Sequence, residues 1–179
     1  MEVGAAQAIE FQNDDVEARV AASQAALQTF GSALQAQLQT AMQEGGPLQA
    51  IEVCEQVAPE IAADISEATG WSVGRTSLRL RNPDNAPDEW ERAVLEDFER
   101  RQQAGQPASD LTRHAVIEQD DETVFRFMRA IPTAGLCLAC HGEPGGEIQQ
   151  ALERLYPADA AIGYSEGEVR GAFTVIQRM

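Results

Sequence analysis

Two cysteines and a histidine near residue 140 constrain this chain more than any other feature. Cys137, Cys140 and His141 form the pattern Cys-x-x-Cys-His, which is typical of a site where haem c is attached. Thiols at this spacing can add to the two vinyl groups of one porphyrin, and the adjacent imidazole can then reach the iron. Gly142 follows directly and lets the backbone turn without a Cβ clash. The pattern predicts one covalent haem c per chain.

Three other chemistries of the same residues are weaker. Zinc would need Cys54, Cys137 and Cys140 with either His114 or His141, which is a Cys3His set. The adjacent Cys140 and His141 are awkward as two ligands of one tetrahedral ion, and this disfavours zinc. A thioredoxin-like redox pair would follow a strand and open a long helix, which this motif does not do. A simple disulfide is the last alternative.

Length and charge limit the class of protein. The chain has 179 residues, enough for one domain with a hydrophobic core, so we predict a single haem domain over residues 1–179. Its 29 acidic residues against 13 arginines give a net charge of -16. This charge opposes binding to nucleic acid and suits a basic partner or a solvated surface. No run approaches the roughly 18 apolar residues of a membrane span, so we expect a soluble chain.

The compartment is predicted from the haem motif. In bacteria haem is attached covalently outside the cytoplasm, so we expect a periplasmic or extracytoplasmic protein. The start, Met1 to Gly4, shows neither the basic segment nor the apolar segment of a signal peptide. We therefore expect that a leader or membrane anchor has been removed from this chain.

The first part of the chain predicts one long amphipathic helix over residues 14–44, with Asp14 or Asp15 as its N-cap. Its apolar residues recur every three, four or seven positions and form one stripe. This helix is expected to pack on its own domain or on a second copy in a homodimer. The stripe consists of Val16, Val20, Leu27, Phe30, Leu34, Leu38 and Met42.

A second helix is predicted to start at Gly46-Pro47 and to kink at Pro59. Cys54 shares its apolar face with Ile51 and Ile61. A free cysteine often serves as a small buried hydrophobic residue. Haem attachment uses the other two cysteines and leaves Cys54 as an odd thiol in an oxidising compartment. Cys54 is therefore also a candidate for a role other than packing.

The remaining pattern predicts an antiparallel sheet with helices, which is an α+β fold rather than an all-helical cytochrome. Arg75, Arg79 and Arg81 alternate along the first expected strand, so we expect them on one sheet face, either solvated or paired with haem propionates. His114 is expected to be an ordinary strand-end histidine. The expected strands are 71–81, 114–118, 122–131 and 169–176, and the expected helices are 89–104 and 147–155.

Three segments together resemble one known family. They are GRTSLRLRNPDNAPDEWE at residues 74–91, CLACHG at 137–142 and YPADAAIGY at 156–164. They are similar to the PAS-like single-haem c-type cytochromes, which occur as exported haem proteins and as extracellular sensor regions. The resemblance implies a PAS-like antiparallel sheet flanked by helices, with the haem-binding core at 46–179.

The resemblance also implies a six-coordinate haem iron with His141 on one side and a cysteine thiolate on the other. The family's axial cysteine lies in a helix before the first strand, where this chain has Cys54. Met42 or Met128 could donate a sulfur instead.

A thiolate ligand favours ferric iron and lowers the reduction potential relative to a His/Met cytochrome. We therefore expect a low-potential electron carrier that serves another exported redox protein. The alternative is a redox or gas sensor, in which reduction displaces Cys54 and opens the iron to a small gaseous ligand. No separate acid-base constellation is visible in the sequence, so no catalysis is predicted.

Overall fold

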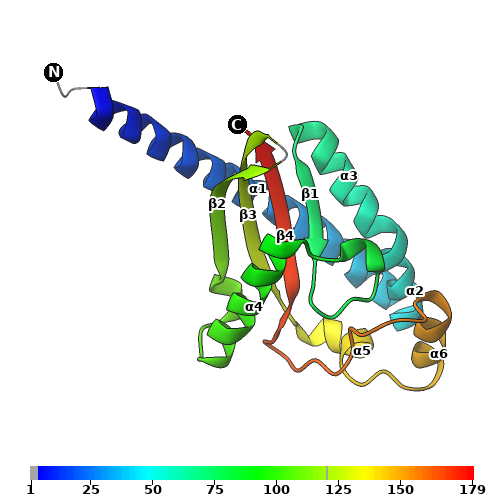
Figure 1. Ribbon diagram of the computed structural model, residues 1–179. Coiled ribbons are helices and arrows are strands. Elements are labelled where there is room, and N and C mark those ends of the chain that lie inside the picture. Colours follow the sequence, from blue (N-terminus) through cyan, green and yellow to red (C-terminus); the bar gives the residue numbers. More distant parts are fainter. Residues whose placement is uncertain (1–3, 120) are drawn as a thin grey trace.

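The computed structural model describes residues 4–119 and 121–179, with side chains from Asp15 onward. Its centre is a four-stranded antiparallel sheet in the order β1-β4-β3-β2 (Figure 1). The strands are β1 (Ser72–Thr76), β2 (Thr112–Gln119), β3 (Glu122–Pro132) and β4 (Val169–Arg178). This sheet, with helices on both faces, confirms the predicted α+β class.

Helices cover both faces of the sheet and gather at one end of it (Figure 1). Side chains alternate along β3, so Phe125 and Phe127 face one layer while Met128 and Ala130 face the other. Helices α1 (Gly4–Glu44) and α3 (Ala58–Thr69) pack on the first face, and α4 (Glu89–Gln103) packs on the second. The short helices α2 (Gly46–Glu52), α5 (Leu138–His141) and α6 (Gly146–Leu155) lie together at the end of the sheet.

The predicted apolar stripe of α1 packs against the sheet of its own domain. Leu27, Phe30 and Leu34 are buried there, and the ring centroid of Phe30 lies 5.0 Å from that of Phe173. The predicted N-cap is wrong, because the helix begins at Gly4 rather than at Asp14 or Asp15. The alanine-rich residues before Asp14 are strong helix formers and extend it. The homodimer stays a prediction.

The second helix is interrupted where Cys54 lies. A π-helical segment, η1 (Val53–Val57), separates α2 from α3, and Pro59 stands in the first turn of α3. Proline has no N–H to donate to the carbonyl four residues earlier, which here belongs to Glu55. The distortion predicted at Pro59 is therefore taken up one turn before it, in the π-helical segment.

The first strand is shorter than predicted, and the expected arginine face is wrong. Strand β1 ends at Thr76, so only Arg75 lies in the sheet, while Arg79 and Arg81 follow in the loop. The chain leaves the strand at Ser77, whose hydroxyl oxygen is 3.0 Å from the carbonyl oxygens of Arg79 and Arg170. These local contacts override the alternating pattern on which the longer strand was predicted.

The other predicted elements are confirmed within a few residues. Helix α4 begins with a capping box in which Asp88 and Glu91 satisfy each other's backbone N–H groups. The turn predicted at Asp120-Asp121 includes residue 120, which lies outside the described residues. Within residues 4–119 and 121–179, no helix has both the length and the apolar content needed to cross a membrane.

We predict that Phe30→Ala lowers the free energy of unfolding by about 3–5 kcal/mol, because it empties a fully buried ring position between α1 and the sheet. Gln28→Ala is the matched control on the exposed side of the same helix and should stay within about 0.5 kcal/mol. Urea unfolding followed by circular dichroism measures both. Equal losses would show that α1 is not part of the core.

Candidate haem site

The three motif residues lie on one tight turn at the end of the sheet. Cys137 closes a short 3-10 turn, η4 (Gly135–Cys137), and Cys140 and His141 follow in α5. All three side chains are half-buried, and both cysteines are free thiols. The sequence spacing therefore places two thiols and an imidazole on a single helical turn.

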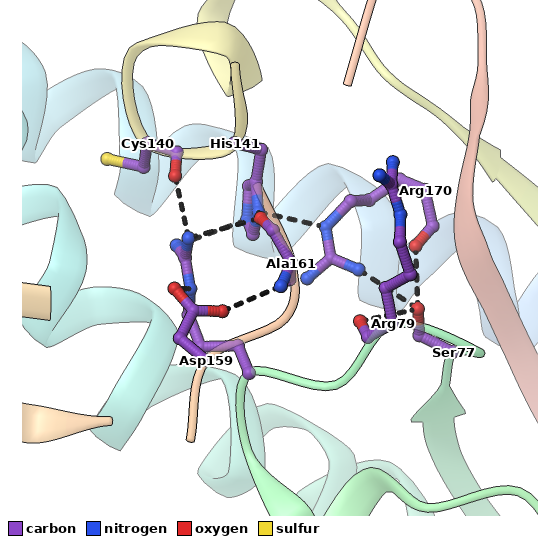
Figure 2. A network of polar contacts seen from close by, with 8 residues as sticks. Ser77, Arg79, Cys140, His141, Asp159, Ala161 and Arg170 are labelled. Carbon is purple, nitrogen blue, oxygen red and sulfur yellow. Dashed lines mark hydrogen bonds and ion pairs between the residues drawn. The ribbon is translucent and has the colours of Figure 1, made fainter. Parts of the chain in front are cut away.

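The residues that follow α6 hold this turn from the side. The backbone N–H of Tyr164 donates to the carbonyl of His141 at 2.9 Å, and that of Gly163 donates to Gly142 at 2.7 Å. The carbonyl of Ala161 lies 2.7 Å from Nδ1 of His141 (Figure 2). Segment 156–164, which carried part of the family resemblance, therefore forms one wall of the site.

This wall selects the tautomer of His141. A carbonyl oxygen only accepts hydrogen bonds, so the contact with Ala161 at 2.7 Å, shorter than the 3.1 Å contact of the same Nδ1 with Nε of Arg170, favours the proton on Nδ1 and the lone pair on Nε2. Burial, followed by the charges of Arg170 and Arg81, lowers the pKa of His141 to about 2. The ring is therefore neutral at ordinary pH, which is the form that binds a metal.

Arg81 turns into the site from the loop after β1. It is 8 % exposed, its Nε donates to Asp159 at 3.0 Å, and one terminal nitrogen donates to the carbonyls of Cys140 at 2.6 Å and Ala161 at 3.3 Å. Its other terminal nitrogen lies 3.5 Å from Nε2 of His141, too far for a strong hydrogen bond. The Nε2 lone pair is therefore not committed to the protein.

Two further arginines surround an aromatic ring behind the histidine. The guanidinium carbon of Arg79 lies 3.5 Å from the ring centroid of Tyr164, and that of Arg170 lies 5.2 Å away. Tyr164 in turn meets the imidazole of His141 edge-on, at 6.2 Å between centroids. Arg170 also donates to the hydroxyl of Ser77 at 3.2 Å (Figure 2). The imidazole is thus enclosed on several sides.

Cys54 lies at the same end of the molecule. Its segment η1 directly follows α2, which packs against both α5 and α6. Burial raises the pKa of the Cys54 thiol, while Arg75, Arg81 and Arg170 lower it and Cys137 raises it. The thiol of Cys54 therefore lies within electrostatic range of Cys137 in the motif.

The zinc alternative lacks a preformed site. Among the side chains that the structure describes, in residues 15–119 and 121–179, no three or more of histidine, cysteine, aspartate or glutamate are arranged to hold a metal ion. His114 lies apart on β2, stacked on Phe125 at 6.0 Å. Met128 is buried in the core beneath α4, and Met42, on α1 itself, packs against the core on the other face of the sheet, so both methionines serve the packing.

Sequence reasoning missed part of this site. Asp159, Ala161, Tyr164 and Arg170 were not predicted as site residues, and Arg81 was assigned to a sheet face. The available signal was the segment YPADAAIGY at residues 156–164. It supported the resemblance, but nothing in its composition shows that it folds against residues 20 positions away.

Comparisons with known proteins agree with this architecture. The family model described as Tll0287-like matches residues 6–178. The solved crystal structure of the cyanobacterial haem protein Tll0287 is similar, with a TM-score of 0.71, 21 % identity, and coverage of 90 % of this chain and 95 % of that chain. A search of the curated proteins found no match. The resemblance and the fold class predicted from the sequence are thereby confirmed.

We predict that Arg81→Ala lowers the free energy of unfolding by about 3–5 kcal/mol, because it leaves the carboxylate of Asp159 buried without its partner. In the control Arg178→Ala, the lost ion pair with Glu122 is exposed and should contribute less than about 1 kcal/mol. Chemical unfolding of the purified proteins measures the difference. A loss for Arg81→Ala as small as that of the control would contradict the prediction.

Proposed function

Because this chain belongs to the Tll0287-like family, we propose that it is a monohaem cytochrome that carries one covalent haem c and transfers single electrons at low potential. One observation carries the proposal. Two free thiols and a neutral imidazole with its lone pair on Nε2 share one helical turn. The haem content of the solved relative supports the same assignment.

The donor set fits such a group. Cys137 and Cys140 would form the two thioether bonds by adding their S–H groups to vinyl carbons, and Nε2 of His141 would bind the iron. The iron supplies a one-electron redox couple. Beside the motif lies an apolar cluster that suits a porphyrin face, made of Ile51, Leu152 and Tyr156 with Cys140, Ile148, Ala151 and Leu155 around them.

Positive charge is concentrated at this site in an otherwise acidic chain. Arg75, Arg81 and Arg170 all lower the pKa of Cys54. In the part of the chain whose side chains are described, Arg75 has neither an ion pair nor a hydrogen bond, and it lies 6.0 Å from the ring centroid of Phe30. These charges favour bound anions, which here are the Cys54 thiolate and the haem propionates.

Cys54 is proposed as the second axial ligand. It lies in a π-helical segment, a backbone form that often marks functional sites. A bound metal would offset the burial that keeps this thiol protonated. A thiolate ligand then favours the ferric state, and the resulting low potential is the basis for the proposed electron carrier.

The proposed partner is an exported redox protein with a basic docking surface, since this chain carries a net charge of -16. The proposed compartment is periplasmic or extracytoplasmic, because haem attachment requires it. Nucleic acid is not a proposed partner, because the charge opposes it.

One observation favours sensing as the second candidate. Segment η1, which holds Cys54, packs directly against the 41-residue helix α1. Release of Cys54 on reduction would free η1, so α1 could carry the change away from the site. Binding of carbon monoxide to the reduced protein would favour this function, and failure to bind it would favour the carrier.

We predict that the protein, produced in a host that attaches haem, keeps its haem stain after denaturing electrophoresis. Replacing both Cys137 and Cys140 by Ser should abolish the stain, because no thioether can then form. Cys54→Ser is the matched control and should keep it. A colourless wild-type protein that carries zinc would overturn the haem assignment.

We predict that Cys54→Ala retains the covalent haem, changes the ferric absorption spectrum and raises the midpoint potential. The rise should be on the order of 100 mV, a fraction of the roughly 0.8 V over which axial ligands set haem potentials. Met42→Leu is the control for loss of the sulfur of a core methionine and should change neither property. An unchanged spectrum and potential in Cys54→Ala would rule out thiolate ligation.

A further inference from the structure

We propose that Asp159 is a positioning residue for His141, which it orients through the backbone of Ala161. The inference rests on the proposed haem function and adds a residue that neither the motif nor the axial pair includes. Asp159 touches neither the imidazole nor the motif thiols. Its carboxylate instead determines which nitrogen of His141 keeps its lone pair.

The first link is a chain of two hydrogen bonds. Oδ1 of Asp159 accepts from the backbone N–H of Ala161 at 2.8 Å. The carbonyl of the same residue accepts from Nδ1 of His141 at 2.7 Å. The N–H and the carbonyl of Ala161 belong to adjacent peptide planes joined at its Cα, so anchoring the N–H restrains the position from which the carbonyl reaches Nδ1. Figure 2 shows Asp159 and Ala161 beside the histidine ring.

The second link runs through Arg81. Oδ2 of Asp159 accepts from Nε of Arg81 at 3.0 Å, and this arginine donates to the carbonyls of Ala161 and Cys140. The two links therefore form a closed ring of contacts around the turn that bears His141. The two side chains are only 7 % and 10 % exposed, so water does not compete effectively for these bonds.

Arg170 competes with Ala161 for Nδ1 of His141, so the contacts that hold the Ala161 carbonyl in place affect the tautomer. Nε of Arg170 lies 3.1 Å from Nδ1 of His141. If Nδ1 accepted that hydrogen bond, the proton would move to Nε2 and the lone pair offered to a metal would be lost. The carbonyl of Ala161 is closer, at 2.7 Å, and requires the opposite tautomer. Asp159 stabilises the arrangement in which Nδ1 donates to this carbonyl and does not accept from Arg170.

Partners of this kind orient metal-binding histidines and increase their basicity. When Nδ1–H donates to a well-placed carbonyl, Nε2 becomes a stronger donor and stabilises the ferric state. Asp159 therefore contributes to the low potential of the proposed cytochrome without touching its cofactor.

The test compares Asp159→Ala with Asp159→Asn in the haem-loaded protein. The amide oxygen of Asn can still accept from Ala161, whereas Ala cannot. Exchange of the His141 Nδ1 proton with solvent is followed by proton NMR of the oxidised protein. In Asp159→Ala we expect exchange about tenfold faster, which corresponds to the loss of one hydrogen bond. Asp159→Asn should remain near the wild-type rate, as should the exposed control Asp110→Ala.

Three results would overturn the proposal. The first is an unchanged exchange rate in Asp159→Ala. The second is equally faster exchange in Asp159→Ala and Asp159→Asn, which would show that the negative charge of Asp159, and not its hydrogen bond to Ala161, slows the exchange. The third needs no variant and is the absence of a slowly exchanging Nδ1 proton in the wild-type protein. That measurement decides the matter if Asp159→Ala does not fold. The exchange of core amides such as Phe127 separates local loosening from general instability.

Failure of the proposed function gives a different result, which is a wild-type protein without covalent haem. In that case the tautomer of His141 is read from the nitrogen-15 shifts of its ring. A proton on Nδ1 in the wild type and its loss in Asp159→Ala would still support the positioning role. A proton on Nε2 in the wild type would refute it.

Discussion

The buried ion pair between Arg81 and Asp159 joins segments that lie far apart in the sequence. Its arginine comes from the loop after β1, its carboxylate follows α6, and their shared contacts end on the turn at Cys140 and His141. Breaking a buried pair leaves an uncompensated charge, so these segments stay together in the folded state. The pair restrains the turn that bears the motif through these contacts, since one helical turn has little rigidity of its own.

The fold leaves one end of the sheet available for this arrangement. Helices α1 and α3 cover one face and α4 covers the other, so the connection from β3 to β4 is free to form α5, α6 and segment 156–164 at the end (Figure 1). Positive charge from Arg75 and Arg170 gathers there within a chain of net charge -16, beside Arg81, whose charge is paired with Asp159. The net negative charge keeps the surface solvated, whereas the arginines at this end of the sheet favour anionic ligands.

Periodic features of the sequence predicted most of the fold. The stripe of α1, helix α4 and the two longest strands each follow from local pattern and are present. The end of β1, and with it the direction of Arg79 and Arg81, was not predictable, because contacts of Ser77 with Arg170 93 positions later decide it. Cys137, Cys140 and His141 are recognisable by spacing alone. Asp159 is not, since its role depends on two backbone groups and a tertiary ion pair.

The segment around Cys54 shows why carrier and sensor are difficult to separate by fold alone. A π-helical turn interrupts the α-helical hydrogen-bond pattern here, and Pro59, in the first turn of α3, has no N–H with which to continue that pattern. If Cys54 stays on the iron in both oxidation states, the turn is a rigid ligand holder, which suits electron transfer. If Cys54 leaves, the same turn is the element most easily rearranged, and α1 packs directly against it. Under the proposed Cys54 ligation, the choice between carrier and sensor depends on one free-energy difference, between bound and released Cys54 in the reduced protein, because both functions share the same architecture.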